Sequence, residues 1–450
     1  MFFRIHSNLH GLIKNSVLIL SFLVVILSVL DSSIVNFFGM FHINGNVLFF
    51  KIIFLCTALF ISLLIYICSN LVKKSLINFK TEIKSEIFFL NFFKYIQIPL
   101  VALLITILTL VEVFNFYKVI FLYGLIIITH LSGLIYFTWF IIKSLNWFLN
   151  SRNIYVLLYI SSFIIFSTFI LFSLINYIFN LTHLFKDVTY IPYYELKLTI
   201  GLALTNWQIT STHFVLLFLS FLSMWITTSL LLNQYIRKKN KSYFWSLISL
   251  PLVYYIIQFL FIELDYLSSI ILIDPFNNLI VYEFLFVFST PLAGIIFGIS
   301  MLFISRKFAI KEIRNNLFIL SIGFMFLFCS FQPNSLLYKP FPPFGISIVL
   351  MSIGTFMIVV SLYQIIFIVS KNVAISKELI NIMGKKNLFI YFSEGKKIYE
   401  LTTIVNQINH SVSVSQFDPE NEPKDMSKEE ISDILEFIKE ELEKSTHSGN

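Results

Sequence analysis

Charged residues are scarce in this chain. They make up 13% of its 450 residues, about half of the roughly 25% that is usual in soluble domains. Hydrophobic residues reach 57%, and the mean hydropathy is +0.84. One aqueous core cannot hide that much apolar surface, so an ordinary soluble protein is excluded. The composition predicts an all-α fold, namely a polytopic transmembrane helical bundle in a lipid bilayer.

Glycine and proline are also scarce, with 14 and 11 residues respectively. These counts are roughly half of the average usage of about 7% and 5%. Transporters built from two inverted repeats bind substrate at broken helices, which Gly or Pro marks at matching positions of the two halves. The prolines inside predicted spans, Pro99, Pro251 and Pro291, do not match across the halves. The sequence therefore favours continuous helices, and a secondary transporter of a small solute is the alternative hypothesis.

The three cysteines form no metal-binding or disulfide pattern. Cys56, Cys68 and Cys329 all lie in apolar stretches, where a free thiol behaves as a small apolar residue. The chain contains no H-E-x-x-H motif of zinc proteases, no G-x-S-x-G nucleophile elbow, no P-loop and no dinucleotide-binding motif. We therefore expect no enzyme activity, no metal site and no cofactor.

Ten apolar stretches approach the roughly 20 residues that a helix needs to cross the hydrocarbon core of a membrane. They cover residues 13–31, 47–69, 95–114, 119–142, 154–179, 211–232, 243–262, 278–304, 317–331 and 346–370. The chain is thereby divided into a transmembrane bundle over 1–370, a small membrane-proximal cytoplasmic segment over 371–415, and an acidic linker with an amphipathic helix over 416–450.

Basic residues alternate between the connections of these spans. The N-terminus and every second connection hold sixteen Lys and Arg residues, whereas the connections between them hold only Lys118, Lys186, Lys197 and Lys339. Cytoplasmic loops carry an excess of Lys and Arg, so both termini are predicted to lie in the cytoplasm and the bundle in the cytoplasmic membrane. Anionic lipid headgroups explain the net charge of +7, and no nucleic-acid binding is expected.

Ionisable side chains inside the predicted spans are few, and each is a candidate functional group because its burial in lipid is costly. His130 lies near the middle of the fourth span, Glu112 near the outer end of the third and Glu283 near the outer end of the eighth. We interpret His130 either as a neutral imidazole that is hydrogen-bonded across a helix interface, or as a proton relay or ligand contact. The two glutamates are interpreted as interfacial residues or as functional groups.

Small residues recur at every fourth position of the eighth span. Thr290, Gly294 and Gly298 form a stripe that includes a G-x-x-x-G motif, which permits the close approach of two helices. The stripe predicts helix packing, either within the bundle or between two copies of the chain. The oligomeric state stays open.

An outer turn rich in proline and aromatic residues precedes the last span. It reads YKPFPPFG over residues 338–345, and its prolines stiffen the backbone. The Pro-Pro-Phe-Gly turn, with the basic-to-acidic tail that follows the last span, resembles an uncharacterised family of multi-pass membrane proteins from ammonia-oxidising archaea. The resemblance covers roughly the last third of the chain. It implies an archaeal lineage and no particular activity.

The composition changes after residue 370. Six lysines lie between residues 371 and 410, and the mostly apolar run at 387–392 is interpreted as a strand. Residues 396–405 are interpreted as a following helix or a second strand. About forty residues are few for an independent core, so this segment is expected to lean on the membrane or on a partner.

The end of the chain is acidic. Residues 416–450 hold eleven acidic and four basic side chains, and the proline-containing stretch 418–425 is typical of a linker. An apolar stripe beyond it predicts one face of an amphipathic helix, formed by Ile431, Ile434, Leu435, Ile438 and Leu442. Anionic lipid repels the acidic opposite face. The stripe therefore needs a protein partner, which is another copy, a soluble protein or the basic inner loops of the same bundle.

The leading functional hypothesis is an integral membrane protein of interaction or sensory type, with this helix recruiting a soluble cytoplasmic protein. A helix of this length is marginal in isolation and becomes ordered when its stripe is buried. A secondary transporter remains the alternative.

Overall fold

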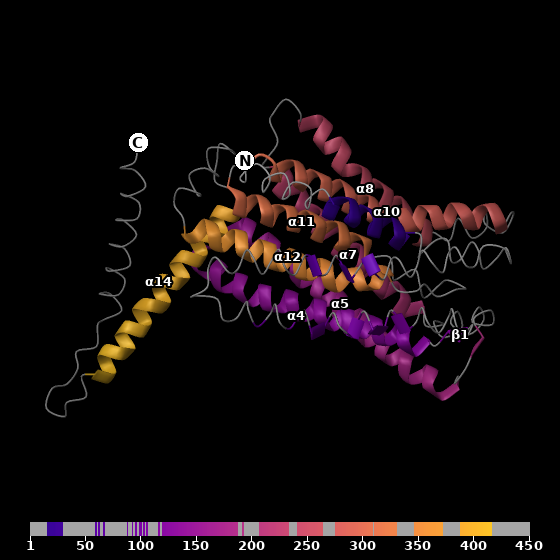
Figure 1. Ribbon diagram of the computed structural model, residues 1–450, viewed down its shortest axis with the longest axis horizontal. Coiled ribbons are helices and arrows are strands. Elements are labelled where there is room, and N and C mark those ends of the chain that lie inside the picture. The colour runs from indigo at the N-terminus through magenta and orange to yellow at the C-terminus, as the bar shows by residue number, and fades with distance from the viewer. Residues whose placement is uncertain are drawn as a thin grey trace, which may run out of the picture.

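The computed structural model describes residues 16–29, isolated residues and pairs of residues between 59 and 106, and residues 116–117, 119–187, 191–192, 207–233, 241–263, 275–308, 310–330, 346–371 and 388–415. These residues are helical apart from short connections and two strands of two residues each. The helices of the bundle lie side by side along one long axis, and the last one, α14, extends from one end (Figure 1).

The helices of the bundle follow one another with short connections wherever the chain between them is described. Their bounds are α4 (Val119–Ser151), α5 (Ile154–Asp187), α7 (Trp207–Asn233), α8 (Lys241–Glu263), α10 (Pro275–Ser305), α11 (Lys311–Cys329), α12 (Ile346–Lys371) and α14 (Leu388–Ser415). A shorter apolar helix, Ser16–Val29, precedes them.

Five stretches of the described helices are long and apolar enough to cross a membrane. They are Tyr123–Leu149, Ile154–Ile178, Val215–Asn233, Lys311–Cys329 and Ser347–Ser370. The chain is therefore a helical integral membrane protein, as its composition predicts. The predicted spans at 47–69 and 95–114 lie mostly outside the described residues, so the count of ten stays a prediction.

The ninth predicted span, 317–331, begins too late. The helix that overlaps it, α11, begins at Lys311 and ends at Cys329, which makes it 19 residues long. Its first turn contains Lys311, Glu312 and Arg314, and these charges concealed the start of the helix. Long charged side chains at a helix end reach out of the apolar layer, so they do not prevent the helix from spanning it.

The interpretation of residues 387–392 as a strand is wrong. Residues 388–392 form the first turns of α14, and residues 396–405 continue the same helix. A short apolar run does not distinguish a strand from a buried helix by its period. As a helix, the segment brings Phe389, Phe392 and Lys396 onto one buried face. Packing against the bundle therefore decided the conformation.

The centre of the bundle is formed by α11 and α12. In their most apolar windows 83% and 89% of the residues are buried, against 44% to 50% in the spanning stretches of α4, α5 and α7. A Cβ atom on Gly354 would lie 2.7 Å from the backbone nitrogen of Leu327, so the two backbones touch here. Gly323 lies against Ile358, one turn beyond Gly354 on α12. The pairing runs in opposite directions along the two helices, which are therefore antiparallel.

The other helices surround this pair. α10 packs on α11 and α8 on α10, whereas α4 packs on α12, α5 on α4 and α7 on α5. Ser132 of α4 donates a hydrogen bond to the Ser352 hydroxyl of α12 at 2.8 Å. The Trp225 indole of α7 donates to the carbonyl oxygen of Ile248 in α8 at 2.9 Å. Polar groups thus link helices that apolar packing alone would leave free to slide.

Several basic helix ends gather at the end of the bundle where α14 begins. α4 ends and α5 begins on either side of Arg152, and α11 begins just after Arg306 and Lys307. Because α11 is antiparallel to α12, its first residue, Lys311, lies at the end where α12 finishes. Arg152, Arg306, Lys307 and Lys311 are all exposed. This end of the bundle is therefore positively charged.

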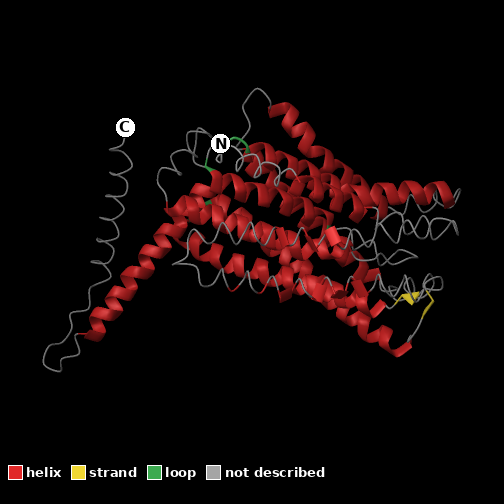
Figure 2. Cartoon of the chain, viewed as in Figure 1, coloured by secondary structure: helices red, strands yellow, loops and turns green. Residues whose placement is uncertain are grey.

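A small pair of strands lies at the opposite end. β1 (Phe116–Tyr117) pairs antiparallel with β2 (Ile191–Pro192), and Phe116 lies opposite Pro192. Figure 2 shows this pair, in yellow, at the end of the bundle remote from α14. It connects the chain before α4 with the chain after α5.

Candidate functional site

The first half of α14 packs against the positively charged end of the bundle. Phe389, Ile390, Phe392 and Ser393 are all no more than 2% exposed, although they belong to the segment predicted to be cytoplasmic. They recur at helical spacing, so they form one face of α14. The helix contacts α4, α12 and α5. The candidate site is thus the interface of α14 with α4, α5 and α12.

Phe392 is the apolar anchor of this contact. Its ring lies edge-on to Trp147 at 6.2 Å and to Tyr159 at 6.4 Å between ring centres. Tyr391, the preceding residue, stacks on Tyr155 of α5 at 5.8 Å. Edge-to-face and stacked arrangements are those that the charge distribution of aromatic rings favours. Burial of the Phe392 side chain contributes about 1.5–3 kcal/mol to docking.

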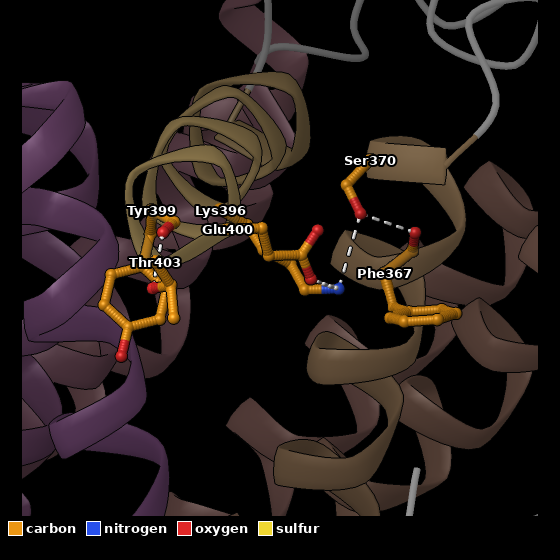
Figure 3. Close-up of polar contacts among 6 residues, drawn as sticks. All are labelled: Phe367, Ser370, Lys396, Tyr399, Glu400 and Thr403. Carbon is orange, nitrogen blue, oxygen red and sulfur yellow. Dashed lines mark hydrogen bonds and ion pairs between the residues drawn. The ribbon is translucent and has the colours of Figure 1, made fainter. Parts of the chain in front are cut away.

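One turn further along α14, a lysine enters the same interface (Figure 3). Lys396 is 3% exposed, and its Nζ lies 3.8 Å from the centre of the Phe367 ring and 5.8 Å from that of Tyr363. The same Nζ donates a hydrogen bond to the Ser370 hydroxyl at 3.4 Å and lies 3.3 Å from Oε1 of Glu400. Two rings, a hydroxyl and a carboxylate therefore surround a buried cation.

Of the two partners in the ion pair of this site, only the lysine is buried. The side chain of Lys396 is 4% exposed, whereas that of Glu400 is 38% exposed. A buried lysine loses its hydration, and it is tolerated when a carboxylate and other polar groups replace the lost water. Glu400 keeps part of its hydration, so the desolvation cost of its charge is smaller than that of Lys396. The cation over Phe367 adds about 2 kcal/mol, as expected for a desolvated cation–π contact.

Hydroxyl groups complete the site. The Ser370 hydroxyl donates to the carbonyl oxygen of Phe367 at 2.8 Å, so it accepts the hydrogen bond from Lys396. On α14, the Thr403 hydroxyl donates to the carbonyl oxygen of Tyr399 at 2.8 Å. Lys396 reaches toward Ser370 and Phe367, whereas Tyr399 and Thr403 point away from them (Figure 3). Lys396 thus links α14 to the end of α12.

His130 lies in the interior between α4 and α5, where it is 3% exposed. Its Nδ1 is 2.8 Å from the carbonyl oxygen of Ile126 on the same helix, so the tautomer with a proton on Nδ1 fits this contact. Its ring lies edge-on to that of Tyr177 on α5 at 5.4 Å. The contact to Ile126 thus lies within α4, and the contact to Tyr177 joins α4 to α5.

The stripe of small residues on α10 faces α11. A Cβ atom on Gly294 would lie 2.9 Å from the carbonyl oxygen of Met325, and one on Gly298 would lie 3.0 Å from that of Ser321. Thr290, one turn before them, is 4% exposed. Any larger side chain at either glycine would push the backbones apart. In this structure the stripe packs within the bundle.

The side chains of the remaining predicted site residues lie outside the described part of the structure. Glu283 lies in α10, but its side chain is not described, and Glu112 lies outside the described residues. The predicted partner-binding stripe also lies outside them: Ile431, Ile434, Leu435, Ile438 and Leu442. Among the residues that are described, no three His, Cys, Asp or Glu side chains are grouped to hold a metal ion.

Lys396 was missed as a site residue in the sequence and counted only as one of six lysines between residues 371 and 410. Its position was the available signal. Lys396 follows Phe392 by four residues and Phe389 by seven, which places it on the apolar face of a helix. A lysine on such a face needs either an aqueous exit for its charge or a buried partner. The signal was lost because residues 387–392 were interpreted as a strand, separate from the helix or second strand expected at 396–405.

Comparison of the chain with protein-family models, with curated proteins and with solved structures finds no match. The fold therefore defines only the class, a helical integral membrane protein.

Proposed function

We propose that this chain is a membrane-anchored interaction protein whose bundle holds α14 and thereby presents residues 416–450 to a soluble partner. The docking of α14 carries this proposal. The first half of the helix is buried at the bundle end through Phe392 and Lys396, and the second half extends from that end (Figure 1). α14 has 28 residues, so it is about 42 Å long at 1.5 Å per residue. A helix held at one end positions the segment that follows it.

The chemistry of the C-terminal segment indicates the kind of partner. Its predicted helix has an apolar stripe, Ile431 to Leu442, and an acidic opposite face. A soluble protein with an apolar groove and basic residues at the rim fits both faces. Rising salt would then weaken binding, because it screens the attraction at the rim.

The proposal includes a topology of ten spans with both termini in the cytoplasm, in the cytoplasmic membrane. The exposed Arg152, Arg306 and Lys311 at the α14 end support this orientation, because positive charge is enriched on the cytoplasmic side. It includes no catalytic step. An archaeal lineage is proposed on the Pro-Pro-Phe-Gly resemblance alone.

A secondary transporter is the second candidate, and the buried His130 is the observation in its favour. The contacts of His130 to Ile126 and Tyr177 fit a packing role equally well. α8 and α10 also continue through Pro251 and Pro291 without a break. Transporters of the inverted-repeat type use broken helices at the substrate site. The described helices therefore favour the interaction hypothesis.

Co-purification from native cells tests the proposal. The double variant Ile434→Glu with Ile438→Glu places two charges on the apolar stripe. The control, Ser432→Glu with Lys439→Gln, changes the net charge by the same amount outside the stripe. We expect the stripe variant to lose soluble proteins that the wild type and the control retain. A stripe variant that retains every partner of the wild type refutes recruitment.

A further inference from the structure

Apolar positions recur at helical spacing along the second half of α14 and form a second stripe in its sequence. It consists of Ile398, Leu401, Val405, Ile408 and Val412. Helical rotation places these positions opposite to Phe392 and Lys396. In agreement, Ile398 is 39% exposed, whereas Lys396, two residues earlier, is 3% exposed. The second stripe is therefore distinct from the docked face of α14.

The spacing of the second stripe is that of a coiled-coil seam. Its steps are three, four, three and four residues, which correspond to the a and d positions of a heptad repeat. Such a seam packs against another helix with the same repeat. The chain contains a second predicted helix with this repeat.

The predicted C-terminal helix has a matching seam. Ile431, Leu435, Ile438 and Leu442 are separated by four, three and four residues. Read backward from Val412, the seam of α14 has the same steps. The two seams therefore match layer by layer when the helices run in opposite directions.

We propose that the C-terminal helix folds back on α14 as an antiparallel helical hairpin. Val412 lies opposite Ile431 in the first layer, and Leu401 lies opposite Leu442 in the last. Every a position of one helix then meets a d position of the other, without an interruption. The connection between the helices, residues 416–426, contains Pro419 and Pro423 and needs only to reverse the chain.

Two physical arguments favour this occupant over a second copy of the chain. A connection this short gives the C-terminal helix an effective concentration on the order of mM near α14, well above that of another chain. The antiparallel direction also returns Glu440 and Glu443 toward the bundle end, where Arg152 and Lys311 are exposed. Opposite charges there attract. A parallel pairing would carry the two glutamates away.

The inference rests on the proposed function, because it describes how the recruiting helix is kept closed. In the hairpin, Ile431 and Leu442 are covered by α14, so a soluble partner binds only after it displaces α14. Only molecules with an open hairpin can bind that partner, so the apparent affinity falls in proportion to the fraction of open molecules.

Disulfide formation in the purified full chain, in lipid nanodiscs and without any other protein, tests the hairpin. Three native cysteines are first replaced by serine. The pair Val405→Cys with Ile438→Cys occupies a central layer, whereas Leu401→Cys with Ile431→Cys is the control that only a parallel pairing brings together. We expect the central pair to crosslink within one chain about tenfold faster than the control, at a rate that dilution does not change.

Three results overturn the hairpin. These are faster crosslinking of the control pair, crosslinks between chains that disappear on dilution, and absence of any crosslink. If the cysteine variants fold poorly, spin labels at Thr402 and Lys439, which flank the seams, report the same proximity without altering them. Because no partner is present, failure here refutes the hairpin alone. Crosslinking that persists while the native chain recruits no soluble protein refutes recruitment alone.

Discussion

Replacement of Lys396 tests whether one buried lysine holds α14 on α12. Lys396→Glu places a carboxylate over the face of Phe367, where the ring attracts cations and repels anions. It also places two like charges four residues apart, next to Glu400, which destabilises a helix. Lys396→Met keeps the length of the side chain and removes the charge. Lys396→Ala removes both.

The structure sets the size of each effect. The buried stem of Lys396 contributes about 0.8 kcal/mol per methylene group, and its cation over Phe367 about 2 kcal/mol. Lys396→Met keeps most of the first contribution, and the charge no longer has to be desolvated. We expect it to weaken docking by less than about 1.5 kcal/mol. Lys396→Ala loses both contributions, about 3–5 kcal/mol, and Lys396→Glu loses at least as much.

The rate of labelling at a buried position measures docking. Ile390 is 1% exposed, so Ile390→Cys reacts with a maleimide only when α14 leaves the bundle. The assay uses the full chain in nanodiscs, without its native cysteines. A loss of about 3 kcal/mol raises the fraction undocked, and hence the labelling rate, more than about a hundredfold. Lys396→Met is expected to raise it less than about tenfold.

Lys397→Glu is the matched control, because it makes the same charge change at the next residue, which is half-buried. Its labelling rate is expected to stay close to that of the wild type. A wild-type rate in Lys396→Glu would refute the role of this lysine and assign docking to the apolar contacts around Phe392. An equal increase in Lys397→Glu would assign the effect to net charge instead.

Three further predictions concern the bundle. Gly354→Ala should lower the thermal unfolding midpoint in detergent, because the added Cβ atom meets the backbone of α11 and such overpacking costs about 1–3 kcal/mol. The control Gly124→Ala should leave the midpoint nearly unchanged, because the nearest atom lies 3.9 Å from the added Cβ. A cysteine introduced at Lys239 should be labelled only from the cytoplasm and one at Asn334 only from outside, and labelling of both from one side contradicts the ten-span topology. His130→Asn should reduce the yield of folded protein, because lost buried contacts cost about 1–3 kcal/mol; normal yield with loss of solute uptake would favour the transporter.

Much of the bundle follows from local sequence. A membrane-spanning helix needs only a sufficient run of apolar residues, because the bilayer supplies the apolar surroundings and the helix satisfies its own backbone. The predicted spans at 119–142, 154–179 and 346–370 accordingly begin where α4, α5 and α12 begin, although α4 continues to Ser151 and α5 to Asp187. The start of α11 was misplaced because a charged first turn resembles a loop when the partners of its side chains are unknown.

The faces of these helices were not predictable, since most of them are apolar all round. The pairing of α11 with α12 depends on Gly323 and Gly354, which are separated by a long stretch of chain and meet only in the folded bundle. The small residues on α10 indicated a close approach, but not the helix that approaches. Lipid-facing and core-facing apolar residues look alike in a sequence.

The sequence by itself determined that this chain resides in a membrane and that its tail is acidic, because these properties are sums over local composition. Only the tertiary structure decided that α14 belongs to the bundle and that Lys396 is a buried contact rather than a solvated charge. The reason is physical. A lysine is stable away from water only when Phe367, Ser370 and Glu400 are close around it, and the first two come from another helix.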